Sequence, residues 1–270
     1  MHNGDIYKEL LKKVEQEETV ALVTVIDTSG SAPGKTGFKM LVDSSGITLG
    51  TVGGGLVEAT VIQDALQAIR EKQSRSSSYK LDQDTAGGLG MLCGGDTSVF
   101  IDVIAAPETL LIVGAGHVAQ PLAAIAAILG FKVVVMDDRD EFCNQERFPS
   151  ATQCLVGDVG ELLAAATITP STYIVIITRG HAYDQIALEQ TINSKASYLG
   201  MIGSKKKVQV IYNNLRQQGI AESLIERVYA PIGMDIGAKT AEEIGISILA
   251  EIIAHKYGKS GKQTNAQPLE

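Results

Sequence analysis

The stretch from Thr109 to Ala119 constrains the fold of this chain more than any other part of its sequence. A short apolar strand, Leu110 to Val113, runs directly into the loop Gly114-Ala-Gly-His-Val-Ala119. In such a strand–loop–helix unit the first glycine permits the tight turn, and the second lets backbone amides approach a phosphate at the helix N-terminus. The small residue at the end lets the helix pack closely on the sheet. The pattern predicts a Rossmann-type unit.

An acidic residue closes the next apolar segment. The run from Lys132 to Met136 reads as a second strand, and Asp137 follows it directly. A carboxylate at this place binds a ribose hydroxyl in dinucleotide-binding folds. Gly114, Gly116 and Asp137 are therefore candidate nucleotide-binding residues, whereas hydride transfer does not follow from the fold alone.

Strand-like and helix-like segments alternate after Pro107, as a doubly wound parallel sheet requires. We expect an α/β fold with a Rossmann-like C-terminal domain at 107–258, a smaller N-terminal α+β domain at 1–106 and a disordered polar tail at 259–270. Further C-terminal strands are expected at 153–156, 173–178 and 198–202, and helices at 118–129, 183–193, 205–218 and 240–255. In the N-terminal domain, strands are expected at 20–27, 38–43, 47–52 and 97–104, helices at 5–18 and 56–72, and a loose surface loop at 70–78.

The charge, the apolar segments and the cysteines of the chain indicate which partners and which cellular compartment to expect. The formal net charge of −8 argues against nucleic acid or an anionic membrane as the main partner. The chain starts with polar residues rather than a signal peptide, and its longest apolar run, 121–131, is too short to span a bilayer. Three cysteines without a C-x-x-C spacing suggest reduced thiols. We therefore expect a cytoplasmic protein with no membrane segment.

Unusual polar residues follow the later strands. Thr178-Arg179-Gly180-His181 leads to Asp184, and a histidine and an aspartate three apart can serve as an acid/base pair, metal ligands or substrate anchors. The structural alternative is that Asp184 caps the next helix and His181 bonds the backbone.

The segment Gly203-Ser204-Lys205-Lys206-Lys207 places lysines at the start of an expected helix. Lysines oppose the positive end of the helix dipole unless an anion lies there, so a phosphate or a pterin phosphate would relieve the conflict. A solvated basic face is the alternative. Near the C-terminus, Thr240 can cap the last helix, with Glu243 completing a capping box, which is a purely structural role.

Two glycine clusters mark the N-terminal domain. The first is Gly53-Gly54-Gly55 with Glu58, and the second is Gly87-Gly with Cys93-Gly94-Gly95. Glycines at this density let the backbone approach a large flat ligand, or only form turns. The Cys93 thiol could bind a soft metal or carry sulfur, although an inert packing residue is the alternative.

Taken in order, these blocks resemble the XdhC/CoxI family, accessory proteins of molybdenum hydroxylases such as xanthine dehydrogenase. The similarity extends from about Thr19 to Ala254. One departure is visible at Pro33-Gly34-Lys35, where the family often has Pro-Arg; Lys35 would replace a phosphate-holding arginine with a less directional charge. The matching blocks are Gly30-Ser-Ala-Pro33 with Gly37, Gly53-Gly-Gly55 with Glu58, Met91-Leu-Cys93-Gly-Gly95, Gly114-Ala-Gly-His117, Thr178-Arg179-Gly-His181 with Asp184, Gly200-Met-Ile-Gly203-Ser204, Pro231–Ala238 and Glu243–Glu251.

The resemblance implies a protein that binds the molybdenum cofactor, supports its sulfuration by a cysteine desulfurase and delivers it to a molybdenum hydroxylase apoenzyme of the xanthine dehydrogenase type. Such a protein is a maturation chaperone without turnover of its own. The resemblance also suggests roles for single residues: Cys93 near the molybdenum or the incoming sulfur, and Ser204 with Lys205 at the phosphate. A homodimer is expected, because a small glycine-rich domain needs a partner surface to bury enough apolar area.

Two other functions remain open on the residues alone. In an NAD(P)-dependent oxidoreductase, His181 and Asp184 would be the proton-transfer pair and Asp137 would bind the ribose, but the N-terminal glycine clusters would have no role. In a non-catalytic redox sensor, the Rossmann unit would bind NAD(H) and the protein would dock on an enzyme. A Rossmann unit within a cofactor chaperone could also bind a nucleotide.

Overall fold

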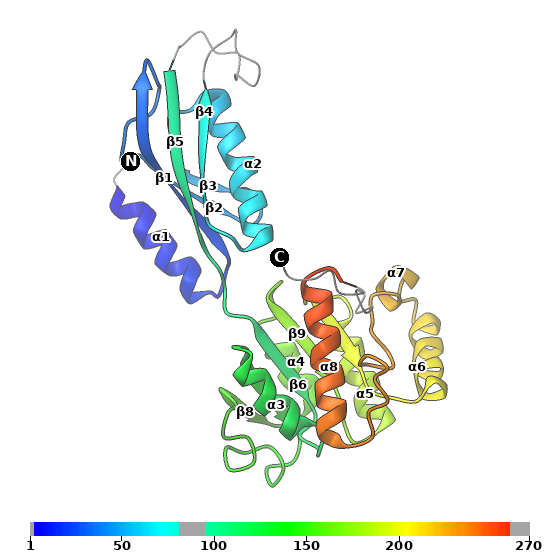
Figure 1. Cartoon of the computed structure of the whole chain (residues 1–270). Coiled ribbons are helices and arrows are strands. Elements are labelled where there is room, and N and C mark those ends of the chain that lie inside the picture. The colour runs from blue at the N-terminus through cyan, green and yellow to red at the C-terminus, as the bar shows by residue number, and fades with distance from the viewer. Residues whose placement is uncertain (1–2, 81–94, 260–270) are drawn as a thin grey trace, which may run out of the picture. The chain divides into compact units, whose positions relative to one another are not determined.

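The computed structural model describes residues 3–80 and 95–259 (Figure 1). The chain divides into two compact units, Met1–Ala106 and Pro107–Glu270, and each has a hydrophobic core of its own. Among the described helices, none is long and apolar enough to cross a membrane. The expected tail at 259–270 lies outside the described residues except for Lys259.

The first unit is a five-stranded antiparallel sheet in the order β3-β2-β1-β5-β4, with a helix on each face (Figure 1). Because side chains alternate along a strand, Val23 packs in the core below α2, while Val20 and Leu41 pack against Ile6 of α1 on the other face. The elements are α1 (Asn3–Glu15), β1 (Val20–Gly30), β2 (Lys39–Asp43), β3 (Thr48–Gly50), α2 (Gly55–Glu71), β4 (Arg75–Lys80) and β5 (Gly95–Ile104).

The expectation of a loose loop at 70–78 is wrong. Helix α2 ends at Glu71, and β4 begins at Arg75 and pairs with β5 along its whole length. Strand β4 lies at the edge of the sheet, and Tyr79 is its one buried residue. An edge strand that buries a single side chain carries no hydrophobic period, which is why the sequence pattern missed it.

The second unit is a five-stranded, fully parallel sheet in the order β10-β9-β6-β7-β8, which confirms the expected Rossmann-like fold. Its strands are β6 (Thr109–Val113), β7 (Lys132–Asp137), β8 (Gln153–Val156), β9 (Thr172–Ile176) and β10 (Tyr198–Met201). Its helices are α3 (Ala119–Ile128), α4 (Val159–Ala165), α5 (His181–Thr191), α6 (Lys205–Gln217), α7 (Glu222–Ile225) and α8 (Ala241–Lys256).

Helices cover both faces of this sheet (Figure 1). Ile112 of β6 packs with Leu122 of α3 and Ile248 of α8, while its neighbour Val113 packs with Leu188 of α5 on the opposite face. A strand buried on both faces reads as a continuous apolar run, which explains why these strands were easy to recognise. The order of the strands reverses between β6 and β9, and open α/β sheets bind ligands at the carboxyl ends of the strands at such a point.

The start of α8 follows the sequence expectation. Thr240 Oγ1 accepts from the Glu243 N–H (3.2 Å), and Glu243 Oε2 accepts from the Thr240 N–H (3.0 Å). This capping box is confirmed. Both residues are satisfied within the helix terminus and are not candidates for chemistry.

Candidate functional site

The loop between β6 and α3 contains two glycines with different surroundings. Gly114 has a φ of 111°, and a Cβ there would lie 2.5 Å from the Ile177 carbonyl oxygen. A Cβ on Gly116 would meet no atom within 4 Å. Gly114 is therefore required by the close approach of the segment after β9, whereas open space lies beside Gly116. His117 is exposed, and Ala119 is fully buried under the sheet, as the Rossmann pattern predicts.

The carboxylate of Asp137, at the end of β7, is fully engaged inside the protein. Its Oδ1 accepts from the backbone N–H (3.1 Å) and the Nε (2.8 Å) of Arg139. Its Oδ2 accepts from the Ala115 N–H of the glycine loop (2.7 Å) and from Arg139 Nη2 (3.0 Å). A carboxylate offers about four acceptor positions. All of them are taken, so no position is left for a ribose hydroxyl in this conformation.

These contacts decide the charge of Asp137, which is 4% exposed. Burial alone would raise the pKa of its carboxyl group, but the hydrogen bonds from Arg139 and Ala115 and the charge of Arg139 outweigh burial and lower the pKa to about 2. The carboxylate therefore stays ionised and joins the glycine loop to the loop after β7.

We expect Asp137→Asn to remove a pH-dependent part of the stability. A pKa of about 2 instead of 3.8 corresponds to ~2 kcal/mol, present above pH ~4 and lost as the pH falls towards 2. Chemical denaturation of both proteins between pH 7 and pH 2 should show a constant difference in unfolding free energy above pH ~5 that shrinks below it. A difference that stays constant down to pH 2 would contradict the assignment.

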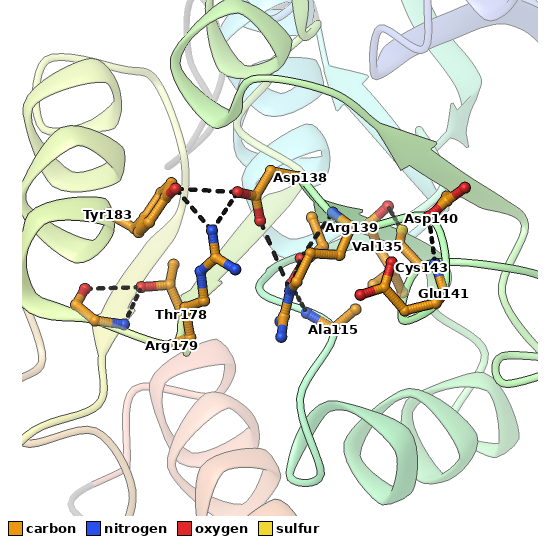
Figure 2. A network of polar contacts seen from close by, with 12 residues as sticks. Ala115, Val135, Asp138, Arg139, Asp140, Glu141, Cys143, Thr178, Arg179 and Tyr183 are labelled. Atoms are coloured by element: carbon orange, nitrogen blue, oxygen red, sulfur yellow. Dashed lines mark hydrogen bonds and ion pairs between the residues drawn. The ribbon is translucent and has the colours of Figure 1, made fainter.

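A second polar cluster joins the loops after β7 and β9. Arg179 Nη2 donates to Asp138 Oδ2 (2.6 Å) and to the Tyr183 hydroxyl (2.8 Å), and that hydroxyl donates to Asp138 Oδ2 (3.0 Å). Figure 2 shows Arg179 and Tyr183 converging on Asp138, with Arg139 and Ala115 nearby. The Arg179 side chain is 45% exposed, so the predicted cofactor residue is anchored but accessible. Sequence reasoning missed Asp138 and Tyr183, although consecutive charges at 137–139 were a usable signal.

The structure does not pair His181 with Asp184. Asp184 is completely buried: its Oδ1 accepts from the Thr178 hydroxyl (2.7 Å) and N–H (3.2 Å), and its Oδ2 forms an ion pair with Lys207. No hydrogen bond joins Asp184 to His181 in the described residues. Asp184 is also not the N-cap of α5, which is Gly180. Asp184 is therefore neither paired with His181 nor the cap of α5, because its partners come from the segment after β9 and from the first turn of α6.

His181 instead contributes to a cavity of about 350 Å³ between α5 and α6. Ser204 is the N-cap of α6, and its Oγ accepts from the Lys207 N–H (3.2 Å). Gly203 lies beside the aliphatic part of Lys207. Lys205 is not among the described residues that line the cavity. Those residues are His181, Ala182, Gln185, Ser204, Lys206, Lys207, Val210, Ile211 and Asn214.

In the first unit, Glu58 closes the glycine loop in front of α2. Its Oε2 accepts from the Thr51 hydroxyl, the Val52 N–H (3.1 Å) and the Gly54 N–H (3.2 Å). Glu58 was predicted to bind the cofactor, but these hydrogen bonds within the protein explain its position without a bound ligand.

Close backbone contacts account for other glycines of this unit. A Cβ on Gly34 would lie 2.3 Å from the Val52 carbonyl oxygen, and a Cβ on Gly53 would lie 2.7 Å from the Gly34 nitrogen. The arginine of the family pattern therefore has no space at position 34, and Lys35 beside it is exposed. Gly95 opens β5 with its backbone against Ser29.

The predicted contact between Cys93 and a metal falls on a part of the chain that the structure does not describe. Cys93 and Gly94 lie outside the described residues. Within the described residues, no group of three or more His, Cys, Asp or Glu side chains is arranged to hold a metal ion.

The fold and the polar groups at the carboxyl ends of the strands define a Rossmann-type protein in which Asp137 accepts a hydrogen bond from the backbone of the glycine loop. Residues 110–252 match the family described as the XdhC Rossmann domain, and residues 14–80 match the XdhC and CoxI family. The chain belongs to the XdhC and CoxI family, which confirms the resemblance noted from its motifs.

Three relatives illustrate the family. The chain is 38% identical over 258 residues to "Uncharacterized protein YqeB" of Escherichia coli (strain K12), covering 95% of this chain but 47% of YqeB, so it spans about half the length of that relative. It is 23% identical to a probable xanthine dehydrogenase subunit of Bacillus subtilis (strain 168), covering 93% of this chain and 97% of the relative. It is 23% identical to "Molybdenum cofactor insertion chaperone PaoD" of Escherichia coli (strain K12), covering 86% and 81%.

A crystal structure described as a xanthine dehydrogenase from Bacillus halodurans has a similar fold. The TM-score is 0.52 at 22% identity, covering 96% of this chain and 97% of that chain. At this identity the likeness shows the fold alone.

Proposed function

We propose that this chain binds the molybdenum cofactor and delivers it to a molybdenum hydroxylase apoenzyme of the xanthine dehydrogenase type. Membership in the XdhC and CoxI family supports the proposal. So do the names of two relatives, a molybdenum cofactor insertion chaperone and a probable xanthine dehydrogenase subunit. In this role the cofactor is cargo, and the protein contributes binding and release rather than a chemical step.

The hydrogen bonds that occupy the Asp137 carboxylate are the observation that favours a cofactor carrier over a dehydrogenase. In a dinucleotide-binding protein this carboxylate would bind a ribose hydroxyl, but here its acceptor positions are occupied by donors from Ala115 and Arg139. The suggested proton-transfer pair is also separated, because buried Asp184 bonds Thr178 and Lys207 rather than His181. The structure therefore shows neither a free carboxylate for the ribose nor a His181–Asp184 pair for proton transfer, which were the two sequence arguments for NAD(P)-dependent hydride transfer. Neither observation conflicts with a cofactor carrier.

The finer steps are part of the same proposal. A cysteine desulfurase supplies sulfur to the bound cofactor, Cys93 lies near the molybdenum or the incoming sulfur, and the carrier works as a homodimer without turnover of its own. Thiolates bind soft metals and carry sulfur, which suits Cys93 to this role.

Anaerobic gel filtration tests the proposal directly. The full chain is mixed with molybdenum cofactor, and pterin in the protein fractions is measured by fluorescence after oxidation; NADH runs in parallel. We expect pterin to co-elute at about one per chain by one-site stoichiometry. Retention of NADH without pterin would overturn the proposal and favour a dinucleotide-binding protein, for which the open space beside Gly116 is the supporting observation.

A further inference from the structure

The cavity between α5 and α6 combines basic and polar groups with an apolar wall. His181, Lys206 and Lys207 are its groups that can carry positive charge, and no acidic side chain is among the described residues that line it. Ser204, Gln185 and Asn214 add hydrogen-bonding groups, while Ala182, Val210 and Ile211 provide apolar surface. At about 350 Å³ the cavity lies within the range of small-molecule sites, roughly 300–1,000 Å³. This lining suits a flat ring that carries a phosphate.

The charges at the start of α6 are only partly balanced. The first turn holds three lysines and no acidic residue, although the N-terminus of a helix disfavours positive charge. Lys207 is neutralised by its ion pair with buried Asp184. Lys206 has no ion-pair partner in the described part of the chain, and its side chain lines the cavity together with the Ser204 hydroxyl. Lys205 likewise has no ion-pair partner among the described residues, so of these two unbalanced charges only that of Lys206 lies at the cavity.

We propose that this cavity binds the terminal phosphate of the molybdenum cofactor, with Lys206 as its charged ligand and Ser204 and His181 as further donors. The inference rests on the proposed function and changes its expected detail: the phosphate ligand is Lys206 rather than Lys205. The Asp184–Lys207 ion pair has a positioning role, because it fixes the first turn of α6 and thereby directs Lys206 to the cavity.

Two neighbouring lysines provide the test. Lys206→Ala and Lys205→Ala remove the same charge from the same exposed helix turn, but only Lys206 lines the cavity. Pterin binding to each full-length variant is measured by anaerobic gel filtration over a range of cofactor concentrations. A charge-assisted hydrogen bond is worth about 1.5–3 kcal/mol, so we expect Lys206→Ala to weaken binding roughly 10- to 100-fold. Lys206→Arg should restore most of it, and Lys205→Ala should change it by less than about 3-fold, because exposed charges act weakly.

Competition experiments identify the group that is bound. Excess inorganic phosphate should displace pterin from the wild type and from Lys205→Ala, and should have little effect on the residual binding of Lys206→Ala. An NADH arm separates the two sources of phosphate. If Lys206→Ala weakens NADH retention but not pterin retention, the cavity serves a dinucleotide and the inference is overturned.

The remaining outcomes separate the inference from the proposed function. No pterin on the wild type would remove both. Pterin on the wild type with equal affinities for the two alanine variants would leave the carrier function standing and remove Lys206 from the site. Both lysines are exposed, so unchanged unfolding midpoints should accompany either result and exclude a folding defect.

Discussion

Asp184→Ala is expected to destabilise the second unit by roughly 3–5 kcal/mol, the effect of breaking a buried ion pair by removing one partner. Asp184 is completely buried, and its loss would leave the Lys207 ammonium group and the Thr178 N–H without their acceptor. Chemical denaturation at neutral pH, followed by circular dichroism, measures the change.

The other end of α6 provides the control. Arg216 forms an ion pair with Glu222 (2.6 Å), and both side chains are more than 40% exposed. Glu222→Ala should therefore have a small effect, because exposed ion pairs contribute little. A similar loss for Asp184→Ala and Glu222→Ala would contradict the buried role. The double variant Asp184→Ala/Lys207→Ala should be less destabilised than the sum of the single variants, because it leaves no unpaired ammonium group.

Gly114→Ala is expected to destabilise the same unit by roughly 2–5 kcal/mol, from backbone strain and overpacking together. The residue has a φ of 111°, and its Cβ would lie 2.5 Å from the Ile177 carbonyl oxygen and 2.8 Å from the Thr178 Cα. These neighbours are backbone atoms at the end of a central strand. They cannot move aside without disturbing the pairing of β6 with β9.

Gly116→Ala is the matched control within the same loop. Its added Cβ would meet no atom within 4 Å, so we expect a change of less than about 1 kcal/mol. Thermal unfolding of the two variants beside the wild type makes the comparison. If both alanines destabilise equally, general loop flexibility rather than the contact with Ile177 explains the need for glycine.

Local sequence signals predicted most of the second unit. The apolar runs at β6, β7 and β9 are buried on both faces, so they were visible without knowledge of their neighbours. The capping box at Thr240 and Glu243 was likewise visible, because its partners are three residues apart. Edge strand β4 was missed because its identity depends on pairing with β5 rather than on its own composition.

The candidate site was harder to predict than the fold. The spacing of Asp137 after the glycine loop was recognised, but its partners were not, since the Arg139 guanidinium turns back onto it. His181 and Asp184 are near in sequence, yet α5 places one at a cavity and buries the other. The three lysines that begin α6 look equivalent in the sequence. On the helix, Lys207 pairs with Asp184 and lines the cavity, Lys206 lines the cavity without an ion-pair partner among the described residues, and Lys205 does neither.

The sequence by itself determined the strand and helix segments of the Rossmann unit, the turn at Gly114, the cap of α8 and, through its ordered motifs, the family. These features depend on residues close together in the chain or on apolar content alone. Only the tertiary structure decided that Arg139 and Ala115 occupy the Asp137 carboxylate, that Asp184 forms an ion pair with Lys207 and that Lys206 lines a cavity. The physical reason is that hydrogen bonds and ion pairs require specific distances between atoms on separate elements, and those distances exist only once the strands and helices are packed.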